Sequence, residues 1–191
     1  MKIAITGGIG SGKSYVCRLL EQRGISIYDC DSAAKRLMRS SDTLRQKLCQ
    51  LIGFDAYDSE GHLNKAVVAQ FLLQSEENAK AIDEIVHPAV AQDFLQSGFQ
   101  WMECAILYES GFEKLVDRVI VVTATEEIRI ERIMRRDGID SDKAKGWINR
   151  QWTQEKVRQR ADFEIVNDGK HDLNQQISDI LQSLSQQNNK T

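Results

Sequence analysis

The fold is decided by the stretch IAITGGIGSGKS, residues 3–14 of this 191-residue chain. Its first four residues form a short apolar run that ends at glycine, which is typical of a buried strand. From Lys13 to Arg23 apolar residues recur at helical spacing, and this segment ends before Gly24. A second short apolar run follows at residues 25–28. The order strand, glycine-rich loop, helix, strand predicts the opening of a parallel α/β sheet.

The loop between strand and helix fits the pattern G-x-x-x-x-G-K-[ST] at every required position, from Gly7 to Ser14. Glycines allow positive φ, so that successive N–H groups can surround phosphate oxygens at the positive end of a helix. We expect Lys13 to reach the β- and γ-phosphates and the Ser14 hydroxyl to ligate Mg²⁺. The predicted nucleotide-binding residues of this P-loop are Gly8, Ile9, Gly10, Ser11, Gly12, Lys13, Ser14 and Tyr15.

Other interpretations of the glycines fit less well. A plain strand-to-helix turn needs no lysine and serine after it. The dinucleotide-binding pattern G-x-G-x-x-G also fails, because its last glycine is replaced by Lys13 when counted from Gly8 and by Tyr15 when counted from Gly10. A GTPase needs a guanine-reading Asn-Lys-x-Asp, but Asn64-Lys65 is followed by Ala66-Val67. The sequence therefore favours an ATP-binding enzyme over a GTPase switch.

Two aspartates, Asp29 and Asp31, follow the second predicted strand. At the carboxyl edge of a parallel sheet such carboxylates face bound phosphates, where one could accept a proton and the other orient Mg²⁺ through water. The alternative is that Asp31 or Ser32 only caps the next helix.

The remaining elements are predicted by the same spacing rules. They are helices over most of residues 32–98 with a turn or loop at 53–65, strands at 101–107, 118–123 and 163–166, and helices at 126–136 and 173–184. We expect the polar tail, residues 186–191, to fray.

Composition narrows the possible partners. The chain has 25 basic and 28 acidic residues, a formal net charge of −3, which argues against a nucleic-acid partner. It has no apolar run long enough to span a membrane and no signal-peptide core, so we expect no membrane partner. Its four cysteines are widely spaced, which is typical of reduced thiols in a cytoplasmic protein.

The charge is unevenly distributed along the chain. Residues 129–160 contain ten basic and five acidic residues, a local charge of +5, which leaves −8 for the remainder. A basic helical segment within an acidic protein indicates either a local anionic ligand or a solvated helix face.

The chain resembles the dephospho-coenzyme A kinases, and the resemblance runs over nearly its whole length. The residues that carry it are those of the P-loop, Asp29 and Asp31, Glu60-Gly61 with Leu63, His87-Pro88, Leu107 with Glu109, Arg132, Arg136-Asp137, Gln151, Ala161-Asp162, and Asn167 with Gly169. The resemblance implies a P-loop NTPase three-layer fold with a five-stranded parallel sheet. It also implies a core at about residues 1–31, 99–128 and 161–191, an acceptor-binding helical part at about 32–98 and a lid at about 129–160.

The implied reaction moves the γ-phosphoryl group of ATP to the 3′-hydroxyl of dephospho-coenzyme A. Asp31 would be the general base with Asp29 supporting it, and Arg132 and Arg136 would contact the polyphosphate as the lid closes. Asn167 would lie near the adenine, although Asn167-Asp168-Gly169 is also an ordinary turn. The residues implied to contact the acceptor are Lys65, His87, Glu109 and Asp31; for His87, helix packing is the competing interpretation.

The chain departs from the family pattern at several positions. Tyr15 stands where the family has threonine, Glu103 where it has aspartate, and Ala105 where it has proline. Lys65 replaces an arginine, which keeps the charge but loses the bidentate guanidinium.

Two alternatives stay open at this point. One is a different P-loop small-molecule kinase, such as a nucleoside monophosphate kinase, and the other is a nucleotide-dependent switch protein. We expect a monomer that binds ATP, Mg²⁺ and dephospho-coenzyme A.

Overall fold

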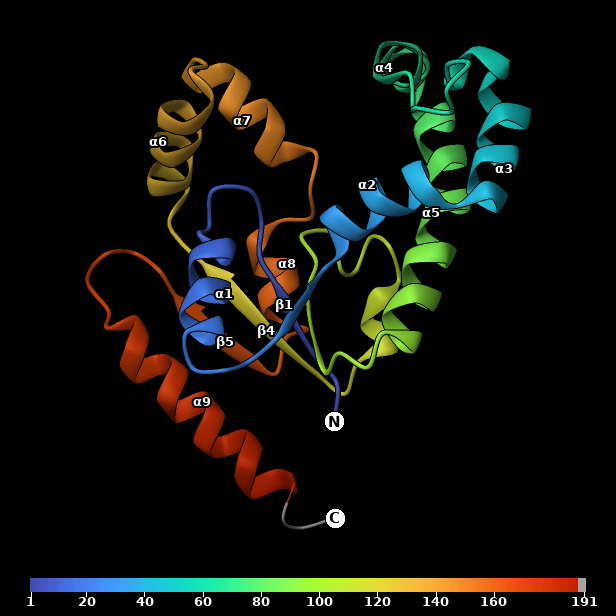
Figure 1. The fold of residues 1–191 in the computed structure, drawn as a ribbon. Coiled ribbons are helices and arrows are strands. Elements are labelled where there is room, and N and C mark those ends of the chain that lie inside the picture. The colour runs from blue at the N-terminus through green and yellow to red at the C-terminus, as the bar shows by residue number, and fades with distance from the viewer. Residues whose placement is uncertain (189–191) are drawn as a thin grey trace. The chain divides into compact units, whose positions relative to one another are not determined.

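The computed structural model describes residues 1–188 and divides the chain into two compact units (Figure 1). We call the first, Met1–Tyr28 with Phe99–Thr191, the core unit, and the second, Asp29–Gly98, the helical unit. Of the tail predicted to fray, residues 186–191, residues 189–191 lie outside the described residues, and residues 186–188 belong to the last helix, α9 (Leu173–Asn188).

The sheet has the strand order β2-β3-β1-β4-β5. Its strands are β1 (Ile3–Thr6), β2 (Ile27–Asp29), β3 (Trp101–Glu103), β4 (Arg118–Thr123) and β5 (Phe163–Val166). Central strand β1 pairs in parallel with β3 and β4, so that Ala4 lies opposite both Met102 and Val119. The loop after β1 therefore leaves the middle of the sheet. The predicted α/β fold with a five-stranded parallel sheet is confirmed.

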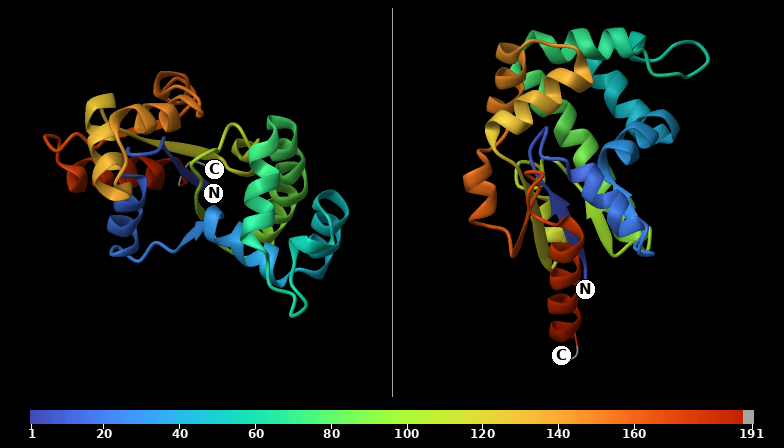
Figure 2. Two further views of the ribbon diagram at one scale, coloured as in Figure 1. Left: turned by 90° about the horizontal axis from the view of Figure 1, so that it is seen from above. Right: turned by 90° about the vertical axis from the view of Figure 1, so that its left-hand side faces the viewer.

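Helices α1 (Lys13–Glu21) and α9 (Leu173–Asn188) lie beside the strands (Figure 2). Apolar side chains of both helices are buried in a core cluster with side chains of the strands. Val16 and Leu20 of α1 meet Ile177 and Ile180 of α9 in one core cluster. That cluster also contains Ile3, Ile5, Ile120, Val122 and Ile165 of the strands. Burying each such side chain contributes roughly 1.5–3 kcal/mol, so the cluster fixes the base from which the P-loop projects.

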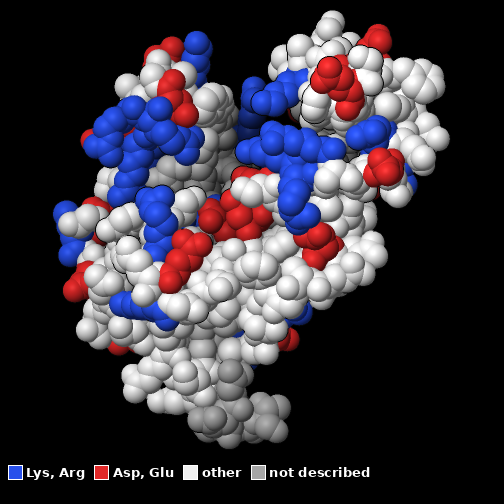
Figure 3. All heavy atoms as spheres, viewed as in Figure 1, with Lys and Arg blue, Asp and Glu red and all other residues white. Residues whose placement is uncertain are grey.

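The basic segment forms three helices, α6 (Glu126–Asp137), α7 (Ser141–Asn149) and α8 (Gln154–Arg158). Each begins after a short polar residue, Thr125, Asp140 or Thr153, whose side chain accepts a backbone N–H of the first turn. Basic side chains gather over α6, where the last turn carries Arg135 and Arg136 (Figure 3).

The helical unit contains α2 (Cys30–Ser40), α3 (Asp42–Ile52), the 3-10 turn η1 (Phe54–Ala56), α4 (Lys65–Gln74) and α5 (Glu76–Gln96). Leu44 and Leu48 of α3 are buried, as are Ile82 and Val86 of α5. The Tyr57 hydroxyl donates to the Met38 carbonyl at 2.6 Å and ties the segment after η1 to α2.

Several element boundaries differ from those predicted. Helix α1 ends at Glu21 instead of Arg23, and α9 continues to Asn188 instead of ending at residue 184. Strand β2 begins at Ile27, because the Ile25 N–H bonds back to the Leu20 carbonyl of α1 at 3.2 Å. Strand β3 ends at Glu103, and the chain then turns, with the Ser110 N–H bonded to the Ile106 carbonyl at 2.9 Å. The predicted loop at 53–65 contains η1 and ends where α4 begins.

Among residues 1–188, no helix is both long enough and apolar enough to cross a membrane.

Candidate functional site

The P-loop adopts a backbone conformation that only glycine accepts easily. Gly10 and Gly12 have φ values of 80° and 86°, in the left-handed region. A Cβ atom on Gly10 would stand 2.6 Å from the backbone oxygen of Arg129, which is closer than real Cβ contacts. Both the dihedral angle and the close approach therefore require glycine at position 10.

Side chains from later in the chain hold the loop. The Arg129 Nε donates to the Ile9 carbonyl at 2.9 Å, and the Ile9 N–H donates to Oε1 of Gln151 at 2.8 Å. The Ser11 carbonyl accepts from Arg132 Nη1 at 3.1 Å and from Asn167 Nδ2 at 2.9 Å. The loop is thus fixed largely by groups that bind its carbonyl oxygens.

The loop ends at an open helix terminus. Gly12 is the N-cap of α1, and no side chain caps this helix. The first N–H groups of an α-helix have no intrahelical acceptor and carry the positive end of the helix dipole. The start of α1, at Lys13 and Ser14, therefore offers backbone donors to an anion.

Lys13 and Ser14 share one carboxylate. The Lys13 ammonium pairs with Oε1 of Glu103, and the Ser14 hydroxyl donates to the same oxygen at 2.8 Å. Glu103 ends β3, the strand beside β1, so the sheet brings a carboxylate to the first turn of α1. Hydroxyl and carboxylate oxygens are the ligands that Mg²⁺ prefers, so this pair fits a metal carried by a nucleotide.

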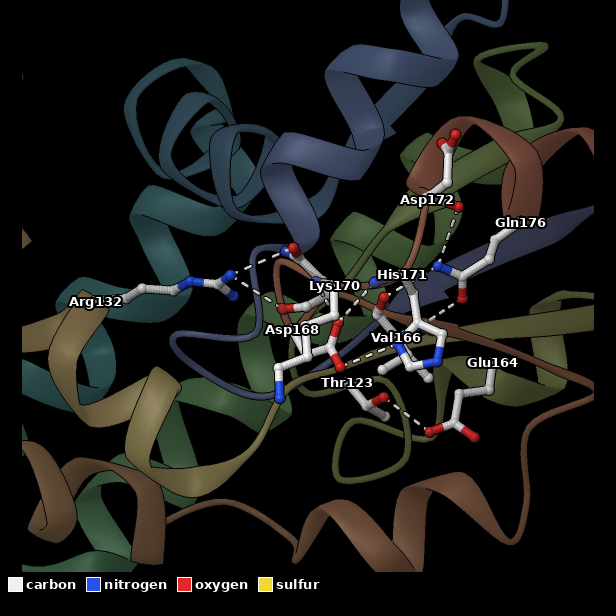
Figure 4. Close-up of polar contacts among 10 residues, drawn as sticks. Thr123, Arg132, Glu164, Val166, Asp168, Lys170, His171, Asp172 and Gln176 are labelled. Atoms are coloured by element: carbon white, nitrogen blue, oxygen red, sulfur yellow. Dashed lines mark hydrogen bonds and ion pairs between the residues drawn. The ribbon is translucent and has the colours of Figure 1, made fainter.

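The side chain of Arg132 extends from α6 to the loop after β5 (Figure 4). Arg132 Nη2 donates to the Asn167 carbonyl at 3.0 Å, while Asp168 accepts the N–H groups of Lys170 at 2.9 Å and His171 at 3.0 Å. The His171 ring lies 3.0 Å from the same carboxylate. These hydrogen bonds hold the pKa of Asp168 well below its ordinary value of 3.8.

The two aspartates after β2 have different roles in the local structure. The Asp29 carboxylate accepts the N–H of Asp31 at 2.9 Å and that of Ser32 at 3.1 Å, and the Ser32 hydroxyl at 2.7 Å. Asp29 is therefore the N-cap of α2, and the alternative that Asp31 or Ser32 is the cap is wrong. Asp31 is exposed in the first turn, and no hydrogen bond or ion pair within the helical unit engages its carboxylate.

A family model described as dephospho-CoA kinase matches residues 1–172. The chain belongs to the dephospho-CoA kinase family. The match includes every predicted site residue, from the P-loop to Asn167.

Curated relatives from this family match along nearly the whole chain. The dephospho-CoA kinase of Bacteroides fragilis is 39% identical over 193 residues, covering 97% of this chain and 94% of the relative. That of Corynebacterium diphtheriae is 34% identical over 189 residues, covering 92% of each.

Solved structures show the same fold. TT1252 from Thermus thermophilus has a TM-score of 0.81 at 29% identity, covering 96% of this chain and 97% of that structure. The dephospho-CoA kinase from Campylobacter jejuni has a TM-score of 0.69 at 23% identity and covers 98% of this chain and 100% of that one. A shikimate kinase from Aquifex aeolicus, at 18% identity, has a TM-score of 0.53, covers 98% of each chain and shares the P-loop kinase fold.

The structure brings some of the predicted site residues together and leaves others apart. Arg132 and Asn167 both bond to the P-loop, whereas Arg136, four residues after Arg132, is exposed and pairs with its neighbour Asp137 at 2.8 Å. Tyr15 is 49% exposed, with the Arg18 guanidinium 5.6 Å from its ring centre.

The predicted acceptor-binding residues are spread over both units. Glu109 lies in the core unit and accepts the Trp152 N–H at 3.0 Å. Lys65 and His87 lie in the helical unit, Lys65 exposed at the start of α4 and His87 within α5, 3.4 Å from Asp83.

Three residues that contact the P-loop or its first helical turn are absent from the site predicted by the sequence. In the sequence, Glu103 stands out only because it departs from the family pattern. Gln151 is one of the residues that carry the resemblance, but the sequence assigns it no role. Arg129 is one member of the basic segment. The available signal for Glu103 is that it is the one charged residue in the predicted strand 101–107. The long-range contacts of Gln151 and Arg129 have no local sequence signature.

Proposed function

We propose that this chain transfers the γ-phosphoryl group of ATP to the 3′-hydroxyl of dephospho-coenzyme A, releasing ADP. The observation that carries the proposal is the uncapped start of α1 behind a glycine loop, with Lys13 and Ser14 in its first turn. The names of the curated relatives support the choice of acceptor.

In this proposal, the N–H groups at the start of α1 bind the phosphates and Lys13 moves from Glu103 to the β- and γ-phosphates. Ser14 and Glu103 would hold Mg²⁺, Ser14 directly and Glu103 through water. When bound, Mg²⁺ neutralises charge that develops on the phosphate oxygens.

Asp31 is the general base that accepts the proton of the attacking hydroxyl. Its support is the local geometry, because Asp29 caps α2 and fixes the backbone of Asp31 while the Asp31 carboxylate stays exposed. Asp29 is thus a positioning residue in this proposal. A positioned base typically contributes 10²–10⁴-fold, roughly, to the rate.

We assign residues 129–160 to a lid and residues 32–98 to the acceptor-binding part. Arg132 holds the P-loop, and Arg136 exchanges Asp137 for the polyphosphate when the lid closes. Asn167 lies beside the adenine; Lys65, His87, Glu109 and Asp31 contact the acceptor. The proposal includes a monomer. The cytoplasm as its compartment is supported by the wide spacing of the cysteines, and the expectation of no nucleic-acid partner by the net charge of −3. The expectation of no membrane partner is supported by the lack of a long apolar run.

The test is an acceptor-dependence assay of ADP release with Mg²⁺ and ATP. We expect ADP to form with dephospho-coenzyme A and the product mass to match coenzyme A. AMP, CMP and shikimate serve as control acceptors. Turnover with AMP or CMP would favour a nucleoside monophosphate kinase, and slow hydrolysis that ignores every acceptor would favour a switch protein.

A further inference from the structure

Arg129 is a buried cation beneath the P-loop. The residue is 4% exposed, although arginine is almost never fully buried unless it is paired. Among residues 1–188, no carboxylate lies within ion-pair distance of its guanidinium. The nearest acidic influence is Glu126, an exposed residue one turn earlier in α6. The protein therefore keeps a positive charge there without a carboxylate to balance it.

The guanidinium lies directly against the loop. Its Nε donates to the Ile9 carbonyl at 2.9 Å, and its Nη2 would stand 2.5 Å from a Cβ atom on Gly8. The backbone of the same residue approaches Gly10 just as closely. The absence of side chains at Gly8 and Gly10 thus leaves room for Arg129. The charged guanidinium lies on the side of the loop where the Ile9 carbonyl points.

Burying an isolated charge is costly unless a counter-charge or hydrogen bonds compensate it. The hydrogen bond to Ile9 uses Nε, and the loop beside it is the segment that, under the proposed function, receives the phosphates of ATP. A bound polyphosphate supplies the negative charge that this part of the protein lacks.

We infer that Arg129 is a positioning residue that sets the preference of the site for nucleotides with more phosphates. It does so in two ways: the hydrogen bond to Ile9 fixes the loop, and the buried charge attracts the polyanion through the loop. This inference rests on the proposed function only in taking the P-loop as the phosphate site.

Two substitutions separate these effects. Both variants lose the guanidinium Nε donor; Arg129→Gln also removes the charge, whereas Arg129→Lys keeps it, so the difference between them reports the charge. Arg135→Gln is the matched control, since it removes the same charge from an exposed position of the same helix. Dissociation constants for ATP, ADP and AMP are measured by isothermal titration without acceptor, with circular dichroism melting as the check on folding.

We expect Arg129→Gln to weaken ATP binding about tenfold, ADP binding less and AMP binding by less than about twofold. Arg129→Lys should weaken the binding of all three nucleotides by a similar factor of less than about twofold, and Arg135→Gln should change the binding of none by more than about twofold. If Arg129→Gln weakens the binding of ATP, ADP and AMP by the same factor, the inference is overturned, because a residue that only holds the loop would affect all three equally. If Arg129→Gln does not fold, Arg129→Lys decides: a retained preference for ATP over AMP supports the inference, and its loss overturns it.

These titrations are independent of the acceptor assay. A wild-type protein that binds ATP with the expected dependence on Arg129 but does not phosphorylate dephospho-coenzyme A would sink the proposed function and leave this inference standing. The opposite outcome is also possible to recognise. If the wild-type protein phosphorylates dephospho-coenzyme A and the Arg129→Gln variant still prefers ATP to AMP as strongly as the wild type, the proposed function stands and this inference fails.

Discussion

Replacing Gly10 by alanine tests whether the close approach to Arg129 shapes the P-loop. The substitution has two costs. A left-handed φ of 80° is unfavourable for alanine by about 1–2 kcal/mol. The new Cβ would meet the Arg129 backbone oxygen at 2.6 Å, and overpacking of that kind adds about 1–3 kcal/mol, because backbone cannot move aside as a flexible side chain can. We expect Gly10→Ala to lower the free energy of unfolding by about 2–5 kcal/mol.

Two other glycines provide matched controls. Gly138 has a φ of 65°, and no atom lies within 4 Å of the place that a Cβ would occupy, so Gly138→Ala should show only the dihedral cost of about 1–2 kcal/mol. Gly146 lies inside α7 with open space around it, so Gly146→Ala should stabilise the protein by about 0.8 kcal/mol. Urea unfolding followed by circular dichroism measures all three. If Gly10→Ala is no more destabilising than Gly138→Ala, the steric argument for the loop is refuted.

Three further substitutions test single residues. Asp31→Asn should lower turnover by about 10²–10⁴-fold and leave the dissociation constant of ATP unchanged, as seen by steady-state kinetics and titration. Asn167→Ala removes one of the two donors to the Ser11 carbonyl. We expect the free energy of unfolding in urea to fall by about 1–3 kcal/mol and ATP to bind more weakly. Asp168 has a depressed pKa in the folded state, so its stabilising contribution is present above its ordinary pKa and is lost as the pH falls below about 4. Asp168→Asn should therefore reduce stability at pH 7, and its difference from the wild type should shrink below about pH 4.

Each of these expectations has a contrary result. Unchanged turnover in Asp31→Asn would remove Asp31 from the role of base. Wild-type stability and ATP affinity in Asn167→Ala would mean that Arg132 alone is sufficient to hold the Ser11 carbonyl. A constant difference between Asp168→Asn and the wild type from neutral pH down to about pH 3 would contradict the hydrogen-bonded carboxylate in the turn after β5.

The sequence predicts best where one short segment determines its own geometry. The P-loop pattern, the strand before it and the helix after it are all local, and the structure has each of them. The ends of β2 and β3 are less predictable, because the Ile25 N–H bonds back to α1 and the chain after Glu103 turns although its residues are apolar. Apolar character alone does not distinguish a buried strand from a buried turn.

The candidate site is predictable in the same uneven way. Lys13 and Ser14 follow from their motif, whereas Arg129 and Gln151 reach the loop across 120 and 142 residues of chain. Asp29 and Asp31 both stand out in the sequence, but which of them caps α2 depends on backbone geometry that the sequence leaves open. Long-range hydrogen bonds have no spacing rule, so only the folded chain reveals them.

The same long-range bonds determine when the site can form. The P-loop leaves the ribosome before the residues that hold it, because Arg129, Gln151 and Asn167 are synthesised 120, 142 and 156 residues after their partners in the loop. Contacts so distant in sequence close late in folding, since the chain entropy of the intervening segment must first be overcome. A nascent chain that ends before β5 contains the complete phosphate-binding motif and lacks the Asn167 amide that fixes the Ser11 carbonyl. Nucleotide binding should therefore be acquired only after the loop that follows β5 has been synthesised.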